Sequence, residues 1–281
     1  MRKSLLILIG GAEDRKDDRV VLRHLVKLTQ AENVVIIPTA SAYPQDIYSS
    51  YIDVFRDFGV RDLRCLDIRY REEADSEEYI GAVDDADLVY FSGGDQVKLV
   101  RTLNHTRLMD RISQRFEEGS LHIGGTSAGA TAAGNPMIYN GNRNGFQKGS
   151  VKCSEGFAFI DDLVIDTHFS ARKRLARLSQ FLVSDRYTKG IGLDEDTGIV
   201  VYPNMHFRVI GSGMVTVVNS SNVTGSNYKN ISNGDAIRFN NMRIGCLPAG
   251  TLFSIKKWSV LNRSKRNSNY FEMPELEAVL A

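Results

Sequence analysis

The fold is decided by the stretch Leu121-His122-Ile123-Gly124-Gly125-Thr126-Ser127-Ala128-Gly129-Ala130. An apolar run, a pair of glycines and a series of small residues predict a strand, a sharp turn and a helix. Residues 125–129 match G-x-S-x-G, in which a serine on a strained turn points its hydroxyl into a cleft. We therefore expect Ser127 to be a nucleophile and the N–H of Ala128 to face a developing oxyanion. The alternative is a turn whose small residues serve close packing alone.

Similar apolar runs recur along the chain and extend this prediction outward. They are short and rich in Val, Ile and Leu, as expected of strands buried on both faces. Segments with apolar residues at helical spacing lie between them, so the sequence predicts an α/β fold with a doubly wound, mainly parallel sheet. Ligands bind such a sheet outside the carboxyl ends of its strands. The expected strands are Leu5–Ile9, Val34–Ile37, Leu88–Phe91, Leu121–Ile123 and Ile199–Tyr202.

The pattern changes at about His206. Alternating segments split by Asn, Gly and Ser follow, which predicts antiparallel strands and hairpins over Met214–Val218, Ala236–Phe239 and Leu252–Ile255. Because no Pro-rich linker precedes them, we expect one domain over residues 1–281, with the core sheet and helices in 1–205 and a β-rich C-terminal elaboration in 206–281.

Composition excludes several classes of protein. The 281 residues carry 35 Lys+Arg and 34 Asp+Glu, a net charge of +1, so no global charge favours nucleic acid or an anionic membrane. No apolar run approaches the ~20 residues that span a bilayer, and Leu5–Ile9 is too short for the core of a signal peptide. The three cysteines, widely spaced and without a CxxC, indicate neither disulfides nor zinc. We expect a cytoplasmic protein without metal, cofactor, nucleic-acid or membrane partners.

Two further glycine turns follow predicted strands. The first, Gly10-Gly11-Ala12-Glu13-Asp14, lacks the third glycine of a dinucleotide site and the lysine of a phosphate loop, so it is either a tight turn or a ligand-facing loop. In the second, Ser92-Gly93-Gly94-Asp95-Gln96, the glycines allow backbone N–H groups to hold an anion or an oxyanion. Asp95 also fits the N-cap of a helix, and both interpretations can hold together.

A serine nucleophile requires a base. Of the five histidines, His168 follows the apolar run Leu163–Ile165 and therefore falls at a strand end, where the cleft is expected. A packed structural histidine is the alternative.

Four cations lie within the six positions from Arg172 to Arg177. We expect a helix to begin here with Ser170 as its N-cap, and cations in a first turn oppose the helix dipole. An anionic partner accounts for them, and the planar fork of arginine suits a carboxylate. A solvated face or an internal salt bridge is the alternative.

Several motifs in order resemble peptidase family S51, and within it the cyanophycinases, the family also containing the aspartyl dipeptidase peptidase E. The resemblance covers about residues 5–215. It rests on Ile37–Ser41, Ser92–Gln96, Gly125–Ala130, Ile165–Phe169 with the arginines that follow, and Ile191–Thr197.

The resemblance implies a sheet of the class I glutamine-amidotransferase type and a serine exopeptidase. The implied substrate is cyanophycin, a poly-aspartate with arginine on each β-carboxyl, cleaved to β-Asp-Arg dipeptides. Ser127 matches the nucleophile, His168 the base, and Gly94 and Ala128 the oxyanion donors. The implied substrate-binding residues are Asp95, Gln96, Asp166, Thr167, Arg172, Arg174 and Arg177.

This sequence departs from the family pattern at two places. Thr167 stands where the family has Gln. The family's triad acid is expected shortly after the serine, yet Asn140–Phe146 contains no carboxylate. Asn144 is therefore our candidate for the third member, with Asn142 or Glu155 as alternatives, since Asn can orient a base without neutralising it.

Two other functions stay open at this stage. One is a dipeptidase or esterase acting on small Asp-containing substrates. The other is a binding protein that kept the cleft and lost the triad acid. We also expect a homodimer, with the β region after His206 as a candidate interface.

Overall fold

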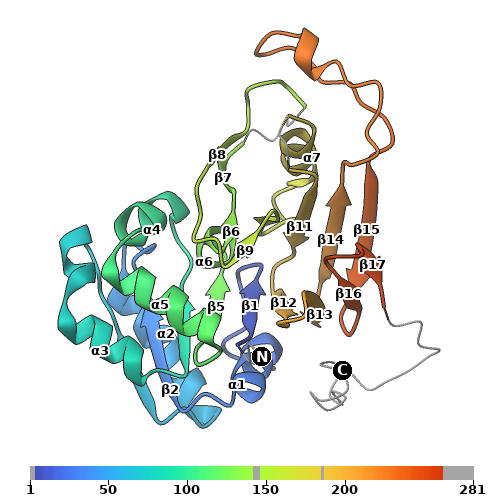
Figure 1. Ribbon diagram of the computed structural model, residues 1–281. Coiled ribbons are helices and arrows are strands. Elements are labelled where there is room, and N and C mark those ends of the chain that lie inside the picture. The colour runs from blue at the N-terminus through green and yellow to red at the C-terminus, as the bar shows by residue number, and fades with distance from the viewer. Residues whose placement is uncertain (1–3, 142–145, 185–186, 262–281) are drawn as a thin grey trace.

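A nine-stranded sheet lies at the centre of the computed structural model, which describes residues 4–141, 146–184 and 187–261 (Figure 1). Its strands are ordered β17-β16-β13-β12-β1-β5-β4-β2-β3. The half from β1 to β3 is parallel, and the half from β12 to β17 pairs antiparallel. The bounds are β1 Leu6–Ile9, β2 Asn33–Ile37, β3 Asp62–Cys65, β4 Leu88–Phe91, β5 His122–Thr126, β12 Thr197–Val201, β13 His206–Gly211, β16 Leu252–Ser254 and β17 Ser259–Val260.

A second sheet of four strands, ordered β10-β11-β14-β15, stands beside the first. β10 and β11 are parallel, and the other pairs are antiparallel. Its strands are β10 Val164–Asp166, β11 Lys189–Leu193, β14 Met214–Asn219 and β15 Arg243–Pro248. Two short pairs complete the strands of the described chain: β6 Gly134–Asn135 with β9 Ile160–Asp161, and β7 Met137–Asn140 with β8 Lys152–Ser154.

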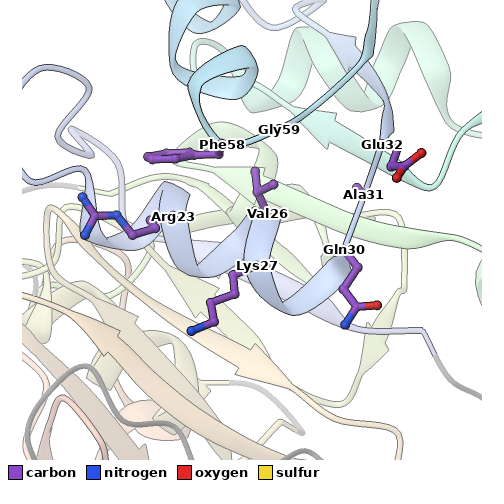
Figure 2. Close-up of a pocket in the computed structure, with 8 residues that line it drawn as sticks. All are labelled: Arg23, Val26, Lys27, Gln30, Ala31, Glu32, Phe58 and Gly59. Carbon is purple, nitrogen blue, oxygen red and sulfur yellow. The ribbon is translucent and has the colours of Figure 1, made fainter.

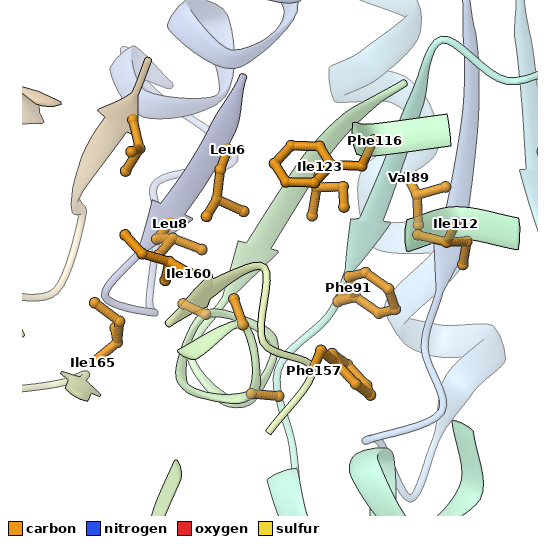
Figure 3. Packing of buried hydrophobic residues seen from close by; sticks show 14 of the residues in the cluster. Leu6, Leu8, Val89, Phe91, Ile112, Phe116, Ile123, Phe157, Ile160 and Ile165 are labelled. Atoms are coloured by element: carbon orange, nitrogen blue, oxygen red, sulfur yellow. The ribbon is translucent and has the colours of Figure 1, made fainter. Parts of the chain in front are cut away.

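Helices cover both faces of the parallel half. Side chains alternate along each strand, so Leu6 and Leu8 of β1 join one core while Ile7 and Ile9 join the other. α1 and α2 pack on the second core, and α3 to α6 pack on the first, part of which Figure 3 shows. The helices are α1 Val20–Thr29, α2 Pro44–Asp57, α3 Glu77–Asp85, α4 Gln96–Leu103, α5 Arg107–Glu118, α6 Ala128–Ala132 and α7 Leu175–Ser184, with short 3-10 turns at Arg71–Asp75 and Tyr228–Asn230.

The predicted α/β fold with a parallel sheet core is confirmed, and so is each predicted buried strand. β3 was not predicted, because it lies at the sheet edge, is only half-buried and carries Asp62 and Arg64. Among the C-terminal predictions, β14 and β16 form, whereas Ala236–Phe239 contributes only an isolated bridge to Gln147. The assignment of the chain to one domain stays a prediction.

The predicted helix start at Ser170 is wrong. Residues 170–174 form turns, and α7 begins at Leu175. Lys173 has a φ of 54°, outside the helical region, and the N–H of Ser170 donates to Asp194 Oδ1 at 2.9 Å. The loop after β10 is therefore tied to the loop after β11 before the helix begins.

None of the three cysteines, which all lie within the described residues, forms a disulfide bond. Among the described residues, no helix is both long enough and apolar enough to cross a membrane.

Close packing explains the glycines on either side of Ser127. A Cβ placed on Gly125 would lie 2.7 Å from the carbonyl carbon of Gly129. A Cβ on Gly129 would lie 2.3 Å from the carbonyl oxygen of Phe91 in β4. Because these neighbours are backbone atoms of buried elements, they cannot move aside. The turn after β5 is therefore pressed against its own helix and against β4.

We expect Gly129→Ala to lower the free energy of unfolding by about 1–3 kcal/mol, because the added methyl overpacks the turn. Gly81→Ala is the matched control. Gly81 lies in α3, where an added Cβ meets no atom within 4 Å, so alanine should stabilise the helix by about 0.5–1 kcal/mol. Urea denaturation of both variants measures the two effects, and equal stabilities would contradict the packing argument.

Candidate active site

Ser127 occupies the strained position between β5 and α6. Its φ of 51° and ψ of −107° lie in a region that residues other than glycine rarely adopt. Its N–H donates to Ile9 O at 3.0 Å, which ties the turn to the end of β1. α6 begins at the next residue, Ala128, whose N–H, like the others of a first helical turn, has no partner within the helix. The side chain thus stands at the carboxyl edge of the sheet, as predicted.

His168 lies against this serine. It is two residues beyond the end of β10, and its Nε2 is 2.8 Å from Ser127 Oγ. Its backbone N–H donates to Gly10 O at 2.8 Å, and the residue is only 7% exposed. Burial lowers the pKa of His168 below its ordinary value, so the imidazole is neutral at neutral pH. A neutral imidazole at this distance can accept the serine proton.

Glu195 completes the arrangement. β10 and β11 are parallel, with Asp166 opposite Gly192, so the residues just beyond the two strand ends lie side by side. Glu195 Oε1 is 2.7 Å from His168 Nδ1. This hydrogen bond raises the pKa of His168 and opposes the effect of burial. A carboxylate in this position can orient the ring and stabilise an imidazolium.

Glu195 was not among the predicted site residues. The acid was expected between the serine and the histidine, although Glu195 lies within the motif Ile191–Thr197. The sequence signal that could have identified Glu195 is its position, because Glu195 and His168 each stand two residues after a buried strand. Glu155 is a wrong candidate, since it is exposed and lies 3.4 Å from His105 Nε2. Asn142 and Asn144 lie outside the described residues.

The second glycine turn lies beside the serine. A Cβ on Gly93 would be 3.3 Å from Ser127 Cβ. Gly94 has a φ of 143° and packs against Ala40 so closely that a Cβ would lie 2.2 Å from its carbonyl oxygen. The loop after β4 therefore approaches the nucleophile with glycine backbone that no side chain covers. Backbone N–H groups in such a loop can serve as donors to an oxyanion.

Three of the predicted substrate-binding residues bind one another instead. Asp166 has no exposed surface and Arg177 is 7% exposed. Arg177 binds Asp166 through Nε at 2.7 Å and through a second, shorter contact from Nη2, while Arg174 Nη1 lies 3.1 Å from Asp166 Oδ1. The expectation that Asp166 and Arg177 contact substrate is corrected, because burial and this bidentate pair occupy their polar atoms. Burial lowers the pKa of Arg174 to about 10, which leaves it charged.

The remaining predicted residues have different surroundings. Asp95 caps α4 by accepting the N–H groups of Val97 and Lys98 at 2.8 and 3.2 Å, and it is exposed. Gln96 Nε2 donates to Ile138 O at 3.2 Å. Thr167 is buried with its hydroxyl 3.3 Å from that of Thr131, whereas Arg172 is exposed.

A separate hollow lies between the end of α1 and the loop after α2 (Figure 2). Its volume is about 320 Å³, and Arg23, Lys27, Gln30 and Phe58 are among its lining residues. Because Gln30 precedes β2, this hollow lies toward the amino ends of the strands. None of the candidate site residues lines it.

Two solved structures share the fold. A peptidase from an acI-B1 Actinobacterium superposes with a TM-score of 0.65 at 23% identity, covering 90% of this chain and 97% of that one. A putative peptidase E protein from Listeria monocytogenes gives a TM-score of 0.51 at 15% identity, covering 75% and 99%.

The sequence is also similar to a known family and to named relatives. The model of Peptidase family S51 matches residues 6–209. The cyanophycinase of Geminocystis herdmanii is 34% identical over 258 residues, which cover 90% of this chain and 94% of that protein. The cyanophycinase of Trichormus variabilis is 33% identical over 270 residues, covering 95% and 91%. The resemblance found in the sequence is confirmed: this chain belongs to peptidase family S51 and is a serine-type peptidase.

Proposed function

We propose that this peptidase is an exopeptidase of the cyanophycinase type, which releases β-Asp-Arg dipeptides from a poly-aspartate chain that carries arginine. The hydrogen-bonded series Ser127–His168–Glu195 is the observation that carries the proposal. Relatives described as cyanophycinases, at 33–34% identity over at least nine-tenths of the chain, support the substrate class. We also propose that the central sheet is of the class I glutamine-amidotransferase type.

The proposed reaction begins when Ser127 Oγ attacks the carbonyl of an aspartyl peptide bond. His168 Nε2 takes the serine proton, and Glu195 stabilises the resulting imidazolium. The N–H groups of Gly94 and Ala128 are the proposed donors to the oxyanion. The imidazolium then protonates the leaving amine, and a water activated by the same base hydrolyses the acyl-enzyme. These steps use only protein groups and water.

Charge complementarity supports an arginyl-aspartate substrate. Arg172 is exposed four residues after His168, and its planar guanidinium suits a substrate carboxylate. Asp95 is exposed beside Gly94 and suits a substrate guanidinium. We therefore assign substrate binding to Arg172 and Asp95, while Arg174, whose side chain is only partly accessible, pairs with Asp166.

A dipeptidase acting on small Asp-containing peptides is the second candidate. Thr167 favours it, because this buried residue binds Thr131 and is shorter than the Gln of the family pattern. The binding-protein alternative loses its motivation, since it rested on a missing triad acid. A cytoplasmic location and a homodimer stay predictions, and ultracentrifugation tests the second.

Ser127→Ala should reduce kcat by about 10⁴-fold or more, because it removes the nucleophile. Hydrolysis of cyanophycin, β-Asp-Arg and Asp-X dipeptides, compared side by side, measures activity and separates the two candidate substrates. Ser259→Ala is the matched control, since Ser259 is exposed on the edge strand β17. Unchanged hydrolysis in Ser127→Ala would reject both peptidase mechanisms.

Two variants should move the acid limb of the kcat/KM–pH profile in opposite directions. The base works only when neutral, so activity falls as pH drops through the pKa of His168. Glu195→Gln keeps an acceptor oxygen but removes the carboxylate charge that raises this pKa, so the limb should move to lower pH while kcat falls by about 10⁴-fold. Arg172→Met removes a positive charge that lowers the pKa, so the limb should move to higher pH. Shifts in the same direction would contradict the assignment of His168 as base.

Substitutions at Arg177 and Arg172 should have different effects, the first on stability and the second on substrate binding. Arg177→Met leaves Asp166 buried without its main partner and should lower the free energy of unfolding by about 3–5 kcal/mol. Arg172→Met should leave stability unchanged and raise KM for acidic substrates about tenfold. Thermal denaturation and steady-state kinetics measure both, and a stable Arg177→Met protein with raised KM would reverse our assignment.

A further inference from the structure

One buried carboxylate takes no part in the proposed mechanism. Glu13 lies in the glycine turn after β1 and is 6% exposed. None of the ion pairs within the described residues includes it. A buried carboxylate without a cation is costly unless hydrogen bonds satisfy it. Its surroundings therefore have to supply donors.

Three hydroxyl groups converge on Glu13. Oε1 accepts the hydroxyls of Tyr51 from α2, through a short contact, and of Tyr90 from β4 at 3.2 Å. Oε2 accepts the hydroxyl of Thr126 at 2.5 Å. Burial, reinforced by the carboxylate, raises the pKa of both tyrosines well above the ordinary value, so both phenols stay protonated and can donate. Thr126 is the last residue of β5 and immediately precedes Ser127.

The backbone of the same turn holds the rest of the site. Gly10 O accepts the N–H of His168 at 2.8 Å, and Gly11 O accepts the N–H of Asp196, next to Glu195, at 2.9 Å. Gly11 has a φ of 95°, and a Cβ there would lie 2.4 Å from Cε1 of His168. The turn is thus in direct contact with the histidine ring, and Glu13 adds a side-chain hydrogen bond between the turn and Thr126 of β5.

We propose that Glu13 is a positioning residue for the peptidase reaction. Its carboxylate joins Thr126, and with it the nucleophile, to the turn whose backbone contacts His168. The inference rests on the proposed function and deepens it. Because a displacement of about 1 Å between reacting groups can cost about 100-fold in rate, a link of this kind acts on kcat rather than on substrate affinity.

The test compares Thr126→Val, Glu13→Ala, Glu13→Gln and the double variant Glu13→Ala/Thr126→Val. Thr126→Val keeps the shape and removes only the donor, so kcat should fall about 10- to 100-fold with KM unchanged. Labelling of Ser127 by a fluorophosphonate should slow in parallel. Since both residues act through one hydrogen bond, the double variant should be no slower than the worse single variant. Glu13→Gln, which keeps one acceptor oxygen, should recover part of the rate.

Two controls remove similar hydrogen-bonding hydroxyls elsewhere, one buried and one half-buried. Thr29→Val deletes a buried hydroxyl that donates to Leu25 O at 2.8 Å in α1. Tyr48→Phe deletes a phenol on α2 that donates to Leu63 O at 2.5 Å, and it pairs with Tyr51→Phe, which removes a donor to Glu13. Only Tyr51→Phe should slow labelling of Ser127.

Wild-type kcat in folded Thr126→Val, or fully additive losses in the double variant, would overturn the inference. If Glu13→Ala does not fold, the rates of Thr126→Val and Tyr51→Phe decide whether Glu13 is a positioning residue. A rate loss that disappears at a temperature where the variants regain full stability would assign Glu13 a structural role only. A wild-type protein with neither turnover nor labelling of Ser127 would refute the proposed function and this inference together, whereas an active wild type with normal variants refutes the inference alone.

Discussion

The contact between Ser127 Oγ and His168 Nε2 joins two sheets. The serine stands at the end of β5 in the nine-stranded sheet, and the histidine stands just beyond β10 in the four-stranded sheet. A hydrogen bond between them requires both sheets to present their carboxyl ends to one place. The turn after β1, which belongs to the nine-stranded sheet, meets this requirement, since its backbone accepts hydrogen bonds from the loops after β10 and β11 and leaves room for the ring only because Gly11 lacks a side chain.

Parallel pairing explains why the acid comes from a distant part of the sequence. Two adjacent parallel strands in register bring the residues after their ends together, whatever the length of chain between them. β10 and β11 do this for His168 and Glu195. The distance in sequence from the serine therefore does not identify the acid, because strand order and register determine which side chains meet.

The arginine cluster shows how burial divides residues of one type. Arg172 and Arg177 are five positions apart, yet one is exposed and the other forms a bidentate pair with a fully buried aspartate. The local clustering of cations at an expected helix start favoured an anionic partner for the whole cluster, with an internal salt bridge as the alternative. The buried pair instead ties α7 to the end of β10, so it holds the segment that carries the base. Separating such roles requires knowing which side chains lose their water, and no local pattern of charge contains that information.

The sequence by itself determined the parallel core, the turn that carries Ser127 and the position of His168 at a strand end. These features follow from local chemistry, because apolar runs must be buried and only small residues fit a turn pressed against a neighbouring strand. The tertiary structure alone decided that Glu195 is the partner of His168, that Asp166 neutralises Arg177 and that Glu13 is enclosed by three hydroxyls. Each of these depends on contacts between segments distant in the chain, and those contacts are fixed by sheet register and packing rather than by neighbouring residues.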